Sequence, residues 1–415
     1  MRVSKLRIVL GIAFSMQVIL AAAQKNTLDY FLDQALDNSP LLKDFQNQQL
    51  SLSLDSQLIG AALKPQVNGN STNLYAPIIN GYGYDEAITN GQQLSALVVV
   101  SKSFLSNKAV AAQVANLQLQ SLITRNNGKI TEQDLKKAII DQYIVVYGEQ
   151  LELDYNSHIN ELLKREDSIL KKLTQDNVYK QTDYLSFTVT RQQQLLTTSQ
   201  LQVQHTFDYS GLNYLAGILD TTVQLLADPH LELRANPDFS SSVFNRQFVL
   251  DSLKLINDKA LLDLNYRPKI DAFADAGYNS SLAYLPYKNF GTSIGINLSI
   301  PIYDGRQRRL QYSKLAIQER TRVNKRDFFI RQHDQQVMQL LQQLRATENF
   351  IEQIDKQITY TETLITVNER LLATGDIRLT DFILALNNYF TARNMVTQNY
   401  VSRLKIVNQI NYWTK

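Results

Sequence analysis

The sequence predicts a mixed α and β membrane protein that is built from two copies of one structural unit. Three observations support this prediction. Four segments alternate between apolar and polar residues as strands do, two segments keep a helical period over about 69 residues each, and the pattern repeats after about 200 residues. At about 1.5 Å per residue the two long helices would each extend roughly 100 Å, which is wider than a compact domain.

The first 23 residues have the three parts of a secretory signal. A basic start precedes an apolar run at 8–20, and residues 21–23 (AAA) offer a cleavage site before Gln24. The run contains Ser15 and Gln17 and is short for a transmembrane helix. We therefore expect residues 1–23 to be a signal peptide.

Charge and cysteine usage exclude several classes of protein. The chain has 42 Lys and Arg residues against 39 Asp and Glu, and the excess of three lies in the first 23 residues, so the mature chain is neutral. A nucleic-acid surface normally needs a basic excess. The absence of cysteine excludes a disulfide framework and a thiolate metal site. An exported chain without a later apolar stretch of about 18 residues can enter a membrane only as a closed barrel.

The first half of the mature chain reads as helix, strand, loop, strand and helix. A helical pattern at 27–63 is followed by strands expected at about 65–75 and 93–103, on either side of a loop at 77–91. Helical periodicity then continues to about residue 173, with an irregularity expected at 126–128 (NNG).

The second half repeats this order. Strands are expected at about 268–279 and 292–301, and a long helix follows to about residue 373. Pro65 and Pro268, which open matching strands, are 203 residues apart, and Phe104 and Tyr303, which follow matching strands, are 199 apart. The similar offsets indicate a tandem duplication.

Each long helix leads into a hairpin tip. Residues 174–183 (TQDNVYKQTD) and 374–381 (TGDIRLTD) interrupt the helical pattern and end in Thr-Asp, which can cap a returning helix. Asp183 and Asp381 are 198 residues apart, the same offset again. In the second long helix, apolar residues from Val337 to Leu372 follow the 3/4 spacing of a coiled coil.

Between the halves, Pro229 and Pro237 break the helical period, and we expect an equatorial linker with a short strand at 230–234. The predicted organisation is therefore a signal peptide at 1–23, a first repeat at 24–222, the linker at 223–245 and a second repeat at 246–415.

The strands are expected to have one apolar face directed to lipid. The face is formed by alternate residues of two strands: Leu94, Ala96, Val98, Val100, Ile294, Ile296, Leu298 and Ile300. Aromatic residues gather at strand ends and in loops, as at a membrane interface: Tyr75, Tyr82, Tyr84, Tyr278, Tyr284, Tyr287 and Phe290. Four strands cannot close a barrel, since about eight is the practical minimum, so the chain must form a dimer or a trimer.

No catalytic residues, cofactor site or metal site can be identified. The four histidines are scattered, and His158 with Glu161 would supply only two metal ligands, which a solvated helix face explains equally well. Residues 81–84 (GYGY) lack the third glycine and the helix of a phosphate-binding loop. The sequence therefore favours a protein that is not an enzyme.

Two motifs resemble those of the TolC-like outer-membrane efflux proteins. Residues 35–40 (ALDNSP) are similar to the family's ALxxNP opening, and residues 298–305 (LSIPIYDG) are similar to its "lsiPlfdGg" segment. Residues 375–381 resemble the family's second helical tip, and the resemblance covers the whole mature chain, including the duplication.

The resemblance implies a homotrimer with a 12-stranded β-barrel in outer-membrane lipid and a long α-helical coiled-coil tunnel in the periplasm. The chain would then be the passive exit duct of a tripartite efflux pump or type I secretion system, working with an inner-membrane transporter and a periplasmic adaptor protein. Asp381 and Asp183 would line the pore aperture, unless they serve only as N-caps. The family often has a second acid three residues after the first, where this chain has Leu384, and the first tip lacks the usual glycine.

Two other classes of function remain open from the sequence. A periplasmic adaptor protein is also exported and has a helical hairpin, but it would have one hairpin rather than two duplicated ones. A secreted enzyme or binding protein on a helical scaffold would need a recognisable site.

Overall fold

The computed structural model describes residues 26–85, 91–234, 239–282 and 285–414. The expected signal peptide, residues 1–23, lies outside the described residues. The chain divides into two compact units. One unit combines residues 1–43, 128–244 and 328–415, and the other combines residues 44–127 and 245–327.

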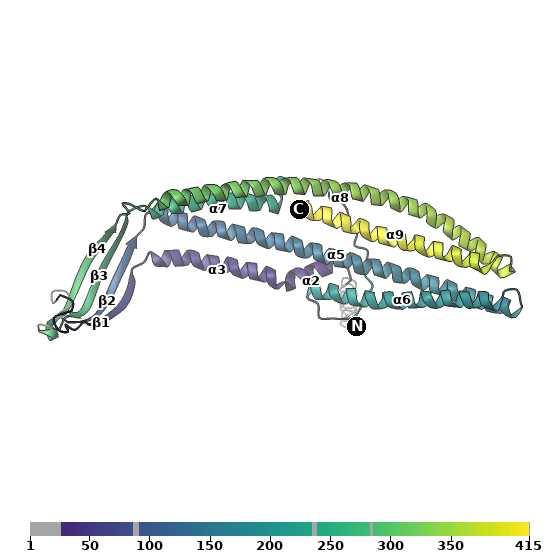
Figure 1. Cartoon of the computed structure of the whole chain (residues 1–415), viewed down its shortest axis with the longest axis horizontal. Helices are drawn as coiled ribbons and strands as arrows, with labels where there is room; N and C mark the ends of the chain where they lie inside the picture. The colour runs from purple at the N-terminus through teal and green to yellow at the C-terminus, as the bar shows by residue number, and fades with distance from the viewer. Residues whose placement is uncertain (1–25, 86–90, 235–238, 283–284, 415) are drawn as a thin grey trace, which may run out of the picture. The chain divides into compact units, whose positions relative to one another are not determined.

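The second of these units contains a four-stranded antiparallel sheet in the order β1-β2-β3-β4 (Figure 1). The strands are β1 (Gln66–Tyr75), β2 (Gln92–Phe104), β3 (Lys269–Ser280) and β4 (Phe290–Ser299). Each begins and ends within two residues of the range expected from the alternation. Because the pairing is antiparallel throughout, the β1–β2 and β3–β4 loops lie at one end of the sheet, and the connections to helices lie at the other.

The duplication is visible in the sheet, since each half of the chain supplies one hairpin and the two hairpins pair through β2 and β3. Gly277 of β3 lies in this central pairing, opposite Leu97 of β2. Its φ is +154°, and a Cβ at this position would lie 2.2 Å from the carbonyl oxygen of Ala96 on β2. Only glycine permits so close an approach of the two strands.

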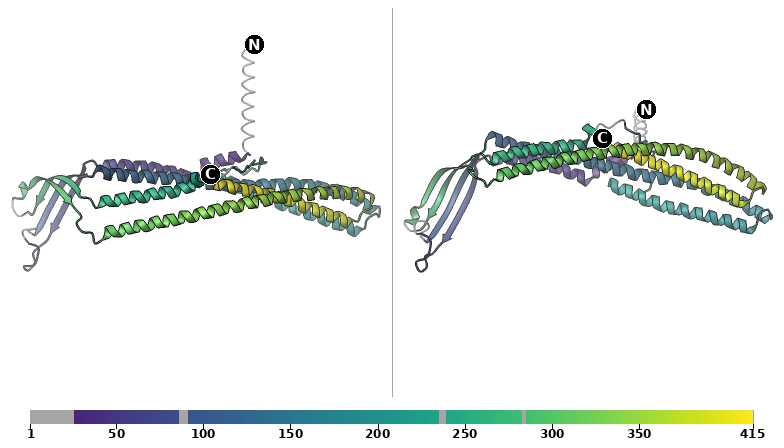
Figure 2. Two further views of the ribbon diagram at one scale, coloured as in Figure 1. Left: turned by 90° about the horizontal axis from the view of Figure 1, so that it is seen from above. Right: turned by 45° about the horizontal axis from the view of Figure 1, so that its top comes forward.

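The helices comprise α2 (Leu28–Asn38), α3 (Pro40–Ala62), α5 (Asn107–Gln175), α6 (Gln181–Ala216), α7 (Val243–Asn265), α8 (Gln307–Thr374) and α9 (Leu379–Trp413). Two short 3-10 helices are η1 (Phe239–Ser241) and η2 (Pro286–Lys288). In the first unit, α5 with α6 and α8 with α9 form two helical hairpins (Figure 2).

Two helical features differ from the expectation. The pattern at 27–63 is not one helix, because it breaks at Ser39, which separates α2 from α3. Conversely, α5 runs through residues 126–128 without interruption. Asn126 is buried there, and its Nδ2 donates to Oε1 of Gln247 on α7 at 3.0 Å. This hydrogen bond stabilises the helix at a residue of low helix propensity.

The predicted short strand at 230–234 is wrong, because the described part of the linker forms no strand. Side chains satisfy its backbone instead. The amide of Gln150 on α5 both donates to the oxygen and accepts from the nitrogen of Leu226, at 3.0 and 2.7 Å. On α9, Asn411 accepts from the nitrogen of Arg234 at 2.9 Å and donates to the oxygen of Glu232 at 2.9 Å. These side-chain amides form the backbone hydrogen bonds that a neighbouring strand would otherwise form.

Asp228 anchors the same linker to both hairpins. Its Oδ2 accepts from the hydroxyls of Tyr147 on α5 and Tyr400 on α9, at 3.3 and 3.2 Å. Burial raises the pKa of this carboxyl, but hydrogen bonds from the His230 N–H and from both hydroxyls outweigh burial and lower it. An ionised Asp228 therefore links α5, α9 and the linker.

Candidate functional site

The sheet has two chemically different faces, and the strand register defines them. Val100 pairs with Ala274, which pairs with Ile294, and residues directly opposite in antiparallel strands share a face. The register thus places seven of the eight side chains expected at lipid on one face: Leu94, Ala96, Val98 and Val100 of β2 and Ile294, Ile296 and Leu298 of β4. Ile300 lies just beyond the end of β4, so its assignment to the strand is wrong.

This apolar face is exposed in the single chain. Ile294 is 87% exposed and Ile296 is 74% exposed. In a sheet surrounded by water, a row of such large apolar side chains would normally be covered by other parts of the protein. The alanines of β3 at 272, 274 and 276 complete the face. On β1, Ser71 and Asn73 interrupt it.

Aromatic side chains lie at both ends of the apolar face. At the loop end, Tyr278 and Phe290 form an edge-to-face pair with ring centroids 5.5 Å apart. At the helix end, Phe104 is exposed, and the Lys102 ammonium lies 5.5 Å from its ring centroid. This is the placement expected of residues at a membrane interface. Tyr284 of the predicted girdle lies outside the described residues.

The opposite face is mostly polar, although Leu97 and Val99 of β2 also lie on it. Asp271 and Asp275 of β3 lie on it, and the Ser293 hydroxyl of β4 donates to Oδ2 of Asp275 at 2.5 Å. Phe273 lies between the two acids and covers Gly295, where a Cβ would lie 2.5 Å from the ring. This composition is typical of a surface that faces water.

The two helical tips have the same backbone design. Asn177 in the first tip and Gly375 in the second are 198 residues apart, and both have positive φ, 62° and 79°. Each ends its long helix in the left-handed conformation, which glycine and asparagine adopt most readily. Asparagine therefore replaces the glycine that the first tip lacks.

Asp183 and Asp381 are not the N-caps of the returning helices, so that expectation is wrong. The N-cap residues are Lys180 for α6 and Arg378 for α9, and neither side chain caps its helix. Each aspartate is the third residue of its helix, where a negative charge is favourable in the field of the helix dipole.

Asp381 is paired with a cation of its own tip. The Arg378 guanidinium donates to both carboxylate oxygens of Asp381, from Nε at 2.9 Å and from an Nη at 3.2 Å. The arginine remains 82% exposed. Lys180 occupies the equivalent position before Asp183. A basic residue three positions before each aspartate is the sequence signal of this pairing.

The tips contact one another within the chain. The Tyr179 hydroxyl of the first tip donates to the carbonyl oxygen of Ile377 in the second at 2.8 Å, and Val178 packs against Gly375. Below this contact lies a shared apolar core that includes Leu170, Phe187, Leu372 and Phe382. The two tips are thus one structural element.

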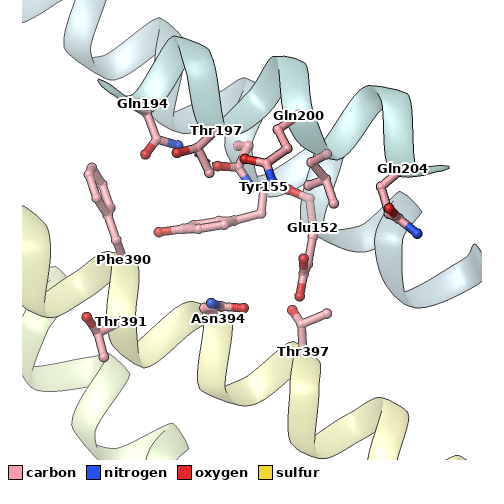
Figure 3. A pocket seen from close by; sticks show the side chains of 12 residues that line it. Glu152, Tyr155, Gln194, Thr197, Gln200, Gln204, Phe390, Thr391, Asn394 and Thr397 are labelled. Atoms are coloured by element: carbon pink, nitrogen blue, oxygen red, sulfur yellow. Dashed lines mark hydrogen bonds between the residues drawn. The ribbon is translucent and has the colours of Figure 1, made fainter. Parts of the chain in front are cut away.

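A polar cavity of about 480 Å³ lies farther along the hairpins, among α5, α6 and α9 (Figure 3). Gln194 and Thr197 of α6 and Asn394 of α9 line it, together with Glu152 and Tyr155 of α5. Burial raises the pKa of the Glu152 carboxyl. The lining offers hydrogen bonds to water or to a polar solute.

The described residues contain no group of three or more metal-ligating side chains. His158, the candidate considered from the sequence, donates a 2.8 Å hydrogen bond from Nδ1 to the Asp154 carbonyl oxygen of its own helix. Among the described helices, none has an apolar stretch long enough to span a bilayer.

The fold is that of several solved outer-membrane proteins. CusC, a protein that forms a transmembrane channel, matches with a TM-score of 0.76 at 12% identity, over 93% of this chain and 92% of that chain. VceC, an outer membrane protein of Vibrio cholerae, matches with a TM-score of 0.73 at 11% identity, over 93% and 96%. The Neisseria gonorrhoeae MtrE outer membrane channel, in its open state, matches with a TM-score of 0.71 at 10% identity, over 94% and 89%.

At these identities the likeness establishes the fold, and it confirms at that level the resemblance seen at residues 35–40 and 298–305. No protein-family model matches the sequence, and no curated protein is similar to it in sequence.

Proposed function

We propose that the chain is the outer-membrane exit duct of a tripartite efflux pump or type I secretion system. The observation that carries the proposal is the exposed apolar face of the sheet, on a chain that has the fold of outer-membrane channels. Leu94 and Phe104 are ten residues apart on β2, about 33 Å along the strand. With a tilt of about 40°, this spans roughly the 25 Å apolar band of outer-membrane barrels.

Assembly follows from the edges of the sheet. Within the described part of the chain, β1 and β4 each have one side that pairs with no strand, and unpaired strand edges are not tolerated in lipid. Three copies would give a closed barrel of twelve strands, with β1 of one protomer beside β4 of the next, and would place the polar face around a water-filled lumen. The helical hairpins would extend into the periplasm, where an adaptor protein and an inner-membrane transporter would deliver the cargo.

The duct would act passively, since its part in transport is to enclose a path rather than to perform a reaction. The two tips of each protomer would form the periplasmic aperture. Three copies of Asp381 and three of Asp183 around a narrow opening would favour cations, as acidic rings do in cation channels. Arg378 offsets part of that charge.

Single-channel recording in planar bilayers tests both proposals. The purified full-length protein should give discrete conductance steps. We expect Asp381→Asn to reduce cation preference and to relieve block by multivalent cations, and Arg378→Gln to increase cation preference, because it removes the charge that offsets the ring.

The matched control is Glu352→Gln, an exposed acid of α8 away from the tips, which should leave selectivity unchanged. If the parent and the three variants all give conductance steps with equal selectivity, the proposal of an acidic aperture is wrong, whereas the proposal of a duct still holds. The absence of conductance steps from a correctly folded assembly would contradict the duct itself.

A further inference from the structure

One carboxylate occupies a position in the hairpin core that the spacing reserves for apolar residues. Near the tips, the inward residues of α5 follow 4-3-4 spacing: Ile159, Leu163, Glu166 and Leu170. The inward residues of α8 follow the same kind of spacing: Ile358, Thr361, Ile365, Asn368 and Leu372. The apolar members Ile159, Leu163, Leu170, Ile365 and Leu372 belong to one packed cluster. Glu166 is thus a core residue by spacing.

The burial of Glu166 agrees with its spacing. Its exposure is 5%, and its neighbours Leu163 and Leu170 in the same row are fully buried. Its Oε2 has no hydrogen-bond partner among the described residues. Burial of an ionised carboxylate without a hydrogen bond to this oxygen is unfavourable, so the site favours the neutral acid.

The stronger of the two charges that act on Glu166 adds to the effect of burial. The like charge of Glu369 on α8 disfavours ionisation of Glu166, and Arg165 of its own helix is a weaker, opposing influence. On α6, Arg191 is engaged by Asp167 at 2.8 Å and is not free to neutralise Glu166. Burial, followed by the charge of Glu369, raises the pKa of Glu166 to about 7 from an ordinary value of 4.5.

We propose that Glu166 and Glu369 form a pH-sensitive latch between the two helical hairpins. When Glu166 is protonated, α5 and α8 pack closely at this level. When Glu166 is ionised, its charge lies in the packed core near the like charge of the half-buried Glu369, and the hairpins loosen there. The latch lies nine residues before the end of α5, next to the tip core.

The sign of the pH effect follows from the direction of the shift. A raised pKa means that the packed state binds a proton more tightly than a state in which Glu166 meets water. The stabilisation of the packed state by protonated Glu166 is therefore complete below about pH 4.5 and is lost as the pH rises through about 7. The packing change does not depend on the proposed function. Its consequence, a wider periplasmic aperture above neutral pH, rests on that function.

Hydrogen exchange measured by mass spectrometry tests the latch on the full-length assembly in detergent. After correction for intrinsic exchange, amides in residues 159–172 and 358–372 should lose protection by about tenfold or more between about pH 5 and about pH 8. In Glu166→Gln, which keeps the shape and removes the titration, protection should remain high throughout. The control Glu161→Gln, an exposed acid of the same helix, should behave as the parent does.

Glu369→Gln gives a second, independent result. Removal of its charge should lower the pKa of Glu166, so the midpoint of the loss of protection moves to lower pH. Only the shift from burial then remains, so the total protection lost by about pH 8 is smaller than in the parent. The proposal is overturned if the parent shows no pH dependence in these segments, or if Glu166→Gln shows the same dependence as the parent. Exchange reports packing and not conduction, so a protein that fails to conduct yet keeps the latch would count against the duct alone.

Discussion

Replacement of Phe382 by alanine should destabilise the tip element by about 3–5 kcal/mol, the range for the loss of a buried phenylalanine. Phe382 is fully buried in the core that joins the two hairpins beneath the tips. The cavity left behind would be lined by residues of both hairpins, so the tips should separate more readily. Denaturant unfolding and limited proteolysis near residues 174–183 and 374–381 measure the effect.

Leu384→Ala is the matched control, because Leu384 lies two residues away on the same helix and is 60% exposed. It should change the stability by less than about 0.5 kcal/mol. Equal destabilisation by both substitutions would mean that Leu384 is covered in the assembly, and that the tip core extends beyond the single chain.

Lysine in place of Ile296 should remove the protein from the outer membrane. Ile296 lies near the middle of β4 on the apolar face, and a lysine on the lipid side at mid-bilayer costs roughly 2–4 kcal/mol. In the proposed trimer the change would occur in each of the three protomers. The amount of protein in an outer-membrane fraction, relative to total expression, is the measurement.

Asn297→Lys tests the opposite face of the same strand. Asn297 pairs with Asp271 on the polar face, where a lysine would meet water and an opposite charge. Membrane levels should be close to those of the parent. Loss of both variants to the same extent would show that the two faces of the sheet are not assigned correctly.

Much of the sheet could be predicted from the sequence, because strand alternation is a local signal. In β2 and β4 alternate residues are apolar, and the residues from Ile294 to Leu298 show this alternation directly. β1 has the weakest pattern, with Ser71 and Asn73 on the apolar side, and its place depends on the pairing with β2. The alternation predicts a strand to about residue 301, but the last paired residue of β4 is Ser299.

The details of the tips and the linker could not be predicted, because they depend on contacts between distant residues. The linker looks extended in sequence, but the groups that hold it, Gln150 and Asn411, come from α5 and α9. At the tips, Thr-Asp resembles a capping pair, yet the helix begins two residues earlier, and Asp381 serves a salt bridge instead. Glu166 was readable in the 4-3-4 row of α5, but only its burial distinguishes it from the many exposed acids of the same helix.

The central claim is that the chain passes through the outer membrane with its sheet loops outside and its tips in the periplasm. Because the chain has no cysteine, single cysteines at Tyr82, in the β1–β2 loop, and at Lys180, in the first tip, can be labelled with a membrane-impermeant maleimide. Tyr82 is 84% exposed and suits this better than Asn80, whose φ is positive. We predict that Tyr82→Cys is labelled on intact cells, whereas Lys180→Cys is labelled only after the outer membrane is permeabilised. Protection of Tyr82→Cys on intact cells, or labelling of Lys180→Cys before permeabilisation, would contradict this topology.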